Sequence, residues 1–478
     1  MSEAGAIVGA ENIEPNPYAV VGLEVEGLHG YISQTLRAEA DGVAKVARLA
    51  VLYGENGTGK TTLLRLIWHL LSPHVDRGHK SAIAMTRFKR AQVHLYDGTT
   101  VCAERSEADV GGFSLIVNAP GRKPLRKKFS CAPHGGIEPY EFSDAMADVL
   151  RERASTTFFL GDDRLISIER SDGSGGFGHE WPAAKVGRGK RGKRGHLVKA
   201  IEPHWQHLQP QWQPNWVQDV LDPEGSHDQL GTAVSRSVDR FHRWVADRFA
   251  AQTSSGMASA HSIYTEVLRQ VSTAAFPPPE TNELGSIVSM LEEIADRSKE
   301  LSQFGLTSPI DSLPMLSQLQ ELRSDPGRTA IAAGLLRPYI ETVAARFAAL
   351  VDLQKVLSTF MEVAAEFLAP KTVAFHVSVG LTVHSPLGES IAVGRLSSGE
   401  KHLLLLLTSA VLARDDQTLF IIDEPEISLN TTWQRRLLPA LLELSAGSTT
   451  QFILASHALA LVSGYRPHVF RLQQGVNS

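Results

Sequence analysis

The chain has 478 residues, of which 43% are hydrophobic, and its formal net charge is −5. This composition is ordinary for a globular protein, and the net charge excludes a basic field over the whole molecule that would attract nucleic acid. Only two cysteines occur, Cys102 and Cys131, so we expect a reducing compartment and no disulfide framework.

Neither export nor membrane insertion is expected. The residues that follow Met1 lack the basic and apolar segments of a signal peptide. The longest apolar run, 403–407 with its continuation to 413, is too short and too interrupted to span a bilayer. We therefore expect a cytoplasmic protein that makes no membrane contact.

The first part of the chain predicts a strand-rich lobe. Residues 19–25, 36–38 and 48–53 alternate apolar and polar positions between turn signals, as strands do. Residues 91–118 predict antiparallel strands with a hairpin turn at Asp97-Gly98, and residues 156–160 predict a further buried strand.

A phosphate-binding loop joins the third of these strands to a helix. Residues 54–61 match G-x-x-x-x-G-K-S/T at every fixed position, and apolar residues recur after them at helical spacing until Pro73. The glycines let the backbone curl, so that N–H groups and the helix N-terminus face phosphate. Lys60 is expected to reach the β- and γ-phosphates of ATP, and Thr61 to coordinate Mg²⁺. The expected nucleotide contacts are Gly54, Glu55, Asn56, Gly57, Thr58, Gly59, Lys60, Thr61 and Thr62.

The composition changes after Arg170. Residues 171–217 are rich in Gly, Pro, Gln and Trp, residues 229–368 have helical apolar spacing, and the strand period returns at 372–383. We expect an α/β fold with a mixed sheet, antiparallel N-terminal strands and an inserted helical lobe. Its predicted segments are an N-terminal half with the phosphate loop (1–170), a basic insertion (171–227), a helical insertion (228–370) and a C-terminal half (371–478).

The insertion contains a basic run at residues 185–194. The run begins with Lys185, ends with Arg194, and holds six basic residues and no acidic one. Such a run can neutralise phosphates without reading bases, and four tryptophans that flank it could stack on bases. A solvated loop and a contact with nucleic acid or another partner both remain open. The four tryptophans are Trp181, Trp205, Trp212 and Trp216.

Residues 396–400 open a long apolar helix. Locally they form a capping box, in which the Ser397 side chain caps the helix and the Glu400 side chain bonds back to the backbone of the cap residue. The segment also resembles the signature motif of ATP-binding cassette (ABC) proteins, in a Ser-Ser-Gly-Glu form. That resemblance implies that Ser397, Ser398 and Gly399 contact the γ-phosphate of ATP bound by the opposite subunit.

Two carboxylates follow a continuous apolar run. Residues 418–422 predict a strand buried on both faces, and α/β sheets place ligands at the carboxyl ends of such strands. Asp423 is expected to hold Mg²⁺, and Glu424 to polarise the attacking water.

A second buried strand, 452–456, ends at His457. A lone histidine at a strand end is more often a packed or solvated residue than a catalytic one. This histidine, however, falls where ABC proteins carry their switch histidine. The resemblance therefore implies that His457 contacts the γ-phosphate and the attacking water.

Residues 423–429 resemble the ATPase domains of OLD-family nucleases and of related antiphage systems of the Septu and PARIS types. Those proteins usually carry His where this chain has Asn430, which leaves any special role of that position open. Their glutamine loop is not assigned here, and Gln92 is one candidate. Because only 21 residues follow His457, we expect any nuclease to be another polypeptide.

These resemblances imply an ABC/SMC-type ATPase that dimerises, or forms a larger homo-oligomer, around ATP. We expect it to control a partner effector, a nuclease, in prokaryotic antiphage defence. The alternatives are a DNA-repair or recombination ATPase without an effector, the ATPase subunit of a membrane transporter, and an ATP-gated scaffold with little turnover. The Ser-Ser-Gly-Glu signature and the helical insertion argue against the transporter.

Overall fold

The computed structural model describes residues 16–38, 43–74, 77–131, 144–153, 156–161, 166–169, 228–273, 283–321 and 325–472. The basic run 185–194 and its four tryptophans lie outside these ranges. The chain divides into two compact units, unit 1 (1–233 and 413–478) and unit 2 (234–412). The four segments expected from composition remain a prediction about domain organisation.

The N-terminal strands of unit 1 form an antiparallel sheet. Its order is β2(Ile32–Arg37), β1(Val20–Leu28), β4(Phe88–Leu95), β5(Thr100–Asp109), β6(Phe113–Asn118) and β7(Leu125–Phe129). The predicted turn at Asp97-Gly98 joins β4 to β5, and Gly98 has a φ of 85°, a conformation that favours glycine. Thr99 N–H donates to the Asp97 carboxylate at 2.8 Å, which stabilises the turn.

The second sheet of unit 1 is mixed. Its order is β15(Val469–Arg471), β3(Leu49–Tyr53), β14(Gln451–Ser456), β13(Thr418–Asp423), β8(Thr156–Leu160) and β9(Ile166–Glu169). All neighbours pair in parallel except β8 and β9. Every residue of β8, β13 and β14 is buried, which confirms the strands predicted from continuous apolar runs.

The core of unit 1 lies around α2(Lys60–Leu71), which packs against strands of both sheets. Leu63, Leu64, Ile67 and Leu70 recur at i, i+1, i+4 and i+7, so one face of α2 is fully buried. Gln451 also joins the two sheets. Its buried amide donates to Val20 O and Val46 O, while its oxygen accepts from Val20 N.

The short helices of unit 1 lie around these two sheets. They are α1(Val43–Val46), α3(His79–Met85), α4(Asp144–Arg153), α11(Thr431–Leu444), α12(Leu459–Val462) and the 3-10 turn η7(Arg466–His468). The sequence patterns did not predict α3, α4 or the strands β7 and β9, because these elements are short and their apolar residues show no clear period.

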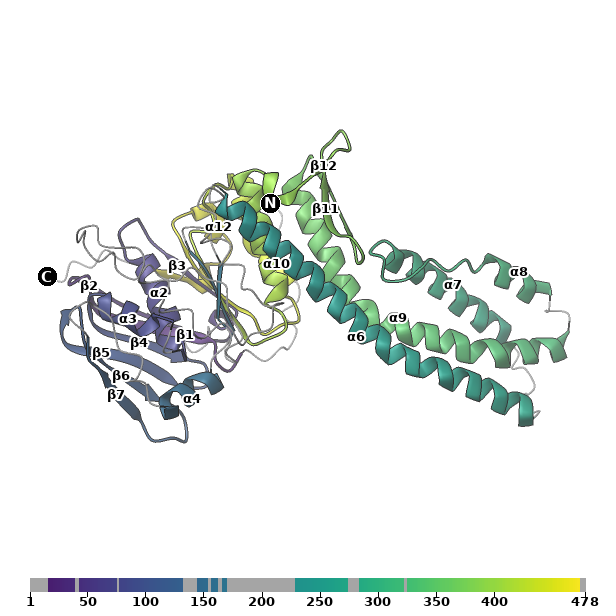
Figure 1. The fold of residues 1–478 in the computed structure, drawn as a ribbon, viewed down its shortest axis with the longest axis horizontal. Coiled ribbons are helices and arrows are strands. Elements are labelled where there is room, and N and C mark those ends of the chain that lie inside the picture. The colour runs from purple at the N-terminus through teal and green to yellow at the C-terminus, as the bar shows by residue number, and fades with distance from the viewer. Residues whose placement is uncertain are drawn as a thin grey trace, which may run out of the picture. The chain divides into compact units, whose positions relative to one another are not determined.

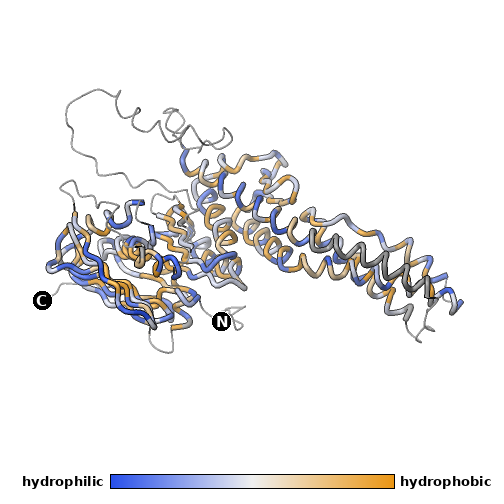
Figure 2. Tube along the Cα trace, turned by 60° about the horizontal axis from the view of Figure 1, so that its bottom comes forward, coloured by the Kyte–Doolittle hydropathy of each residue, from blue (hydrophilic) through white to orange (hydrophobic). Residues whose placement is uncertain are grey.

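Unit 2 is largely helical, as predicted for the insertion. The long helices α6(Gln229–Thr273) and α9(Pro326–Leu368) run side by side, with α7(Glu283–Ser302) beside α9 and α8(Leu313–Glu321) beside α7 (Figure 1). Phe241 stacks on Phe360 with ring centroids 4.4 Å apart, which joins α6 to α9. Hydrophobic and hydrophilic residues alternate along these helices, as expected of amphipathic helices (Figure 2).

A small sheet and the signature helix complete unit 2. The sheet consists of β10(Thr372–His376), β11(Gly380–His384) and β12(Ser390–Ile391), and it is followed by the turn η6(Val393–Arg395) and by α10(Ser398–Leu412). The predicted fold class is therefore confirmed: an α/β fold with antiparallel N-terminal strands, a mixed sheet and an inserted helical lobe. Within the described ranges, no helix is both long and apolar enough to cross a membrane.

Arg105 on β5 fastens the antiparallel sheet to the segment around α3. Its two terminal nitrogens donate to six backbone oxygens, and the guanidinium lies 4.1 Å from the centroid of the Phe88 ring. Burial lowers the pKa of Arg105 to about 10, so the group remains charged at neutral pH. The six oxygens belong to Ile83, Ala84, Thr86, Phe88, Asp109 and Gly111.

Replacing Arg105 by Lys should lower the free energy of unfolding of unit 1 by about 2 kcal/mol. Lysine keeps the charge but has three donors in place of a planar fork, so several backbone carbonyl groups lose their partner. Urea denaturation followed by tryptophan fluorescence measures the shift. Arg126→Lys on β7 is the matched control, because Arg126 pairs with Glu104 at an exposed position. Equal unfolding midpoints for the two variants would contradict this role of Arg105.

Candidate active site

Three parallel strands bring the candidate residues of unit 1 to one edge of the mixed sheet. Ser456 at the end of β14 pairs with Tyr53 at the end of β3, and Asp423 at the end of β13 pairs with Ala455. The segments that follow these strands therefore leave the sheet at the same level. They are the phosphate loop, the pair Asp423-Glu424, and His457.

The phosphate loop has a shape that only glycine allows at fixed positions. Gly57 and Gly59 have φ angles of 84° and 86°, which L side chains rarely adopt. A Cβ at Gly54 would lie 2.9 Å from Thr58 Oγ1 and 3.1 Å from Leu472 Cβ, so a side chain there would displace the loop. Glu55, Asn56 and Gly57 are exposed at the top of the curve.

The Lys60 side chain lies on the inner side of the loop and bonds to its backbone. The residue is 5% exposed, and its Nζ donates to Gly54 O and Glu55 O at 2.9 Å each. Thr58 Oγ1 also donates to Glu55 O, at 2.8 Å. These bonds hold the loop curved around the ammonium group, so that a positive charge lies under the concave backbone.

The loop leads directly into the N-terminus of α2. Gly59 is the N-cap residue, and among the described residues no side chain caps this helix end. The first-turn N–H groups and the helix dipole therefore face the loop. Thr61 and Thr62 lie in this first turn, and Thr62 Oγ1 is 3.3 Å from His29 Nε2.

The two carboxylates at the end of β13 have different environments. Asp423 is 1% exposed, whereas the Glu424 side chain is 24% exposed. Glu424 has a φ of 47°, an uncommon conformation for a residue with a side chain, and its N–H donates to Ala455 O at 2.9 Å. Because of this turn, two consecutive carboxylates point in different directions: that of Asp423 is buried and that of Glu424 is accessible.

His457 lies beside two glutamates. Its Nδ1 is 3.5 Å from Glu424 Oε1 and 3.2 Å from Glu426 Oε1, and its side chain is 46% exposed. Glu426, which lies in the turn after β13, is only 5% exposed. Sequence reasoning missed Glu426, since an acidic residue after a proline reads as an ordinary turn. Only its place in the Asp-Glu-Pro-Glu run could have drawn attention to it.

The signature residues belong to unit 2. Ser397 N and Oγ donate to Glu400 Oε2 at 2.9 and 2.8 Å, and Glu400 N donates to Ser397 Oγ at 3.4 Å, which confirms the predicted capping box. Ser397 and Ser398 are exposed, while Gly399 and Glu400 are buried. The capping box thus holds the helix end in place, and the two serines are exposed at the start of α10.

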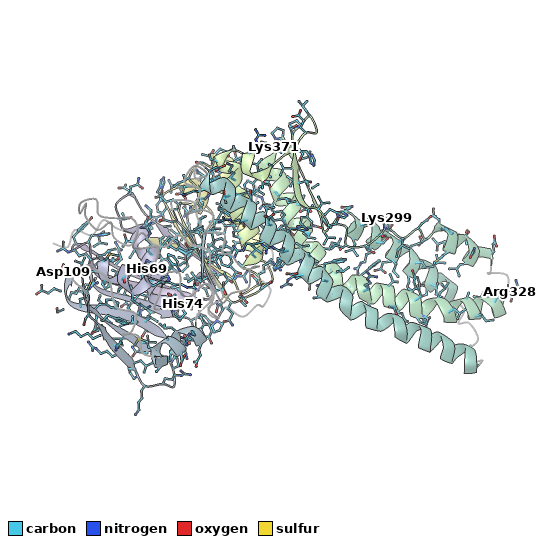
Figure 3. The ribbon with its side chains drawn as sticks, viewed as in Figure 1. His69, His74, Asp109, Lys299, Arg328 and Lys371 are labelled. Carbon is cyan, nitrogen blue, oxygen red and sulfur yellow. The ribbon has the colours of Figure 1, made fainter. Side chains whose placement is uncertain are left out.

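Lys371 reinforces this helix end. It follows α9, as labelled in Figure 3, and its Nζ is 2.5 Å from Glu400 Oε1. Burial acts to raise the pKa of Glu400, but hydrogen bonds from Lys371 and Ser397 outweigh burial and lower this pKa. Glu400 therefore stays ionised and keeps the capping box closed at neutral pH.

Two further positions from the sequence have structural partners. Asn430 is the N-cap of α11, and its side chain accepts from Trp433 N at 2.9 Å, so this asparagine has a local role. Gln92 lies on β4 in the antiparallel sheet and contacts Arg90 and His94. The glutamine loop stays unassigned.

A comparison with known protein families identifies an AAA domain in this chain. A family model described as "AAA domain, putative AbiEii toxin, Type IV TA system" matches residues 199–463, a span that includes the signature, Asp423, Glu424 and His457 but begins after the phosphate loop. No match was found among the curated proteins.

The chain is also similar to solved SMC head domains. The Smc head with an extended coiled coil from Pyrococcus furiosus, bound to the C-terminal domain of ScpA, is 11% identical, covers 96% of this chain and 94% of its own, and gives a TM-score of 0.36. The SMC head domain from Thermotoga maritima is 10% identical, with coverages of 93% and 91% and a TM-score of 0.28. Scores this low add no argument to the fold seen in the sheets. Because the family model matches more than half of the 478 residues, the chain belongs to the family described as AAA domain, putative AbiEii toxin, Type IV TA system.

Proposed function

We propose that this protein binds and hydrolyses ATP. The observation that carries the proposal is the alignment of three strand ends, which brings the loop around Lys60, the pair Asp423-Glu424 and His457 to one sheet edge. Ligands bind at this edge in α/β folds. A curved glycine loop over a buried ammonium group, followed by a helix N-terminus, suits a chain of phosphates.

In this proposal, the residues at this edge have different roles in phosphoryl transfer. Lys60 and the loop N–H groups bind the β- and γ-phosphates. Carboxylate and hydroxyl oxygens are ligands that Mg²⁺ prefers, so Asp423 and Thr61 would hold this ion, which neutralises charge that develops on the phosphates. Glu424 is the accessible carboxylate of the pair and polarises the attacking water. His457 contacts the γ-phosphate or that water.

Each site needs a second copy of the chain. The start of α10 presents Ser397 and Ser398 to solvent, with Gly399 beneath them, on a capped helix N-terminus that can receive a γ-phosphate. In this proposal, ATP bound to Lys60 of one copy meets the signature of the other. Two ATP molecules then lie in a homodimer, and the same contact allows a larger homo-oligomer.

The setting we propose is control of a separate effector, a nuclease, in prokaryotic antiphage defence in the cytoplasm. Two features support this setting. Residues 423–429 resemble the ATPases of OLD-like defence systems, and the matched family is described as a putative toxin of a toxin–antitoxin system. Nucleic-acid contact through the run 185–194 is a further part of this proposal. Co-purification with the protein encoded next to it, followed by a nuclease assay with and without ATP, tests the setting.

Glu424→Gln should still bind ATP but hydrolyse it about 100-fold more slowly, because the carboxylate acts on water and not on the phosphates. Lys60→Ala should instead lose binding, because the ammonium group that faces the phosphates and holds the loop is removed. Calorimetric titration with ATP and a phosphate-release assay separate the two effects. Wild-type binding and hydrolysis in both variants would refute the assigned site.

Mixing two inactive variants tests which copy supplies the signature. Lys60→Ala and Ser398→Arg homodimers should both be inactive, since every site contains one lesion. In a mixed dimer, one site collects both lesions and the other has none. Random exchange should therefore restore at most about a quarter of wild-type activity, since half of the dimers are mixed and half of their sites are intact.

The control for this mixture is subunit exchange itself, followed with two different affinity tags. If exchange is complete and hydrolysis stays at the level of the separate variants, the sites are not shared between copies.

A further inference from the structure

Glu426 makes contacts that the proposed mechanism does not use. Its Oε1 accepts from Ser456 Oγ at 2.7 Å and from His457 N at 2.9 Å, and the same oxygen lies 3.2 Å from His457 Nδ1. Its Oε2 is buried and has no hydrogen-bond partner within the described ranges. One oxygen of a carboxylate that is 5% exposed therefore accepts a hydrogen bond from the backbone of His457 and lies near the ring of the same histidine.

These contacts connect the two segments that carry the proposed water-activating groups. Glu426 follows β13 two residues after Glu424, and His457 follows β14 directly. A carboxylate removed from water is costly unless donors surround it, so Glu426 favours the conformation in which Ser456 and His457 supply them. The end of β14 is fixed in this way relative to the turn after β13.

The contacts also determine which ring nitrogen is available. Two glutamate oxygens lie within 3.5 Å of Nδ1 of His457, and carboxylates only accept hydrogen bonds. Acceptors on this side favour the tautomer with its proton on Nδ1, which leaves Nε2 as the ring atom for the nucleotide. A carboxylate that holds one nitrogen of a histidine sets the tautomer and the orientation of the ring.

We propose that Glu426 is a positioning residue: it holds His457 through Nδ1–H, so that Nε2 faces the γ-phosphate or the attacking water. This inference rests on the proposed function for the role of His457. Glu426 lies closer to Nδ1 of His457 than Glu424 does. It therefore also limits the pairing of this histidine with Glu424, whose carboxylate stays available to polarise water.

The first test needs no ATP. Proton-coupled ¹⁵N spectra of histidine side chains in the nucleotide-free chain report which nitrogen is protonated, and His457→Gln identifies the signals of this ring among the 18 histidines. We expect an Nδ1–H signal that moves in Glu426→Gln and stays in place in the matched variant Glu424→Gln. A ring protonated only at Nε2, or a signal that responds to Glu424→Gln alone, would overturn the proposal.

The second test separates positioning from a purely structural role. Glu426→Gln keeps an acceptor oxygen but loses the charge-assisted bond, so kcat should fall about fivefold while KM for ATP changes little. In a His457→Ala background the same substitution should have no further effect, because the residue through which it acts is absent. Glu443→Gln, at an exposed pair with Arg436, is the control and should match wild type.

An equal loss of kcat with and without His457 would mean that Glu426 only supports the fold, and wild-type kcat in Glu426→Gln would also refute the proposal. A wild-type chain that hydrolyses no ATP would contradict the proposed function instead. In that case the ¹⁵N signals still decide whether Glu426 holds the ring.

Discussion

The site depends on the parallel pairing of β3, β14 and β13. Their buried apolar residues fix the register, and this register brings Tyr53, Ser456 and Asp423 to nearly the same level. A slip of one strand would send its terminal residues to another level and separate the loop from the carboxylates. The hydrophobic interior of unit 1 thus determines where the charged groups lie, although none of its apolar residues takes part in chemistry.

Charged groups around the site are held by specific partners. The Lys60 ammonium is bound by two loop carbonyls, Glu426 by donors from the end of β14, and Glu400 by Lys371 and Ser397. Each arrangement keeps a charge in place before a ligand arrives, which lowers the reorganisation that binding would require. Glu424 differs from these three, because its side chain is the accessible one at the sheet edge.

Long apolar runs and complete motifs made much of this arrangement predictable. Residues 156–160 and 418–422 lie in buried strands as expected, the turn at Asp97-Gly98 joins β4 to β5, and the Ser397–Glu400 box forms. Contacts between distant segments were not predictable, because no local pattern encodes them. Glu426 contacts Ser456 across 30 positions of sequence, and Arg105 donates to backbone oxygens of two segments, 83–88 and 109–111. Lys371 likewise reaches Glu400 only through the packing of unit 2.

The central claim is that ATP joins two copies through the loop of one and the signature of the other. Light scattering of Glu424→Gln, which should bind ATP without consuming it, tests this claim most directly. We predict the mass of one chain, 52.0 kDa, without nucleotide and twice that mass with ATP and Mg²⁺, with no doubling when Ser398→Arg is added. A mass that does not change when ATP is added, or that doubles equally when Ser398→Arg is present, would contradict the account.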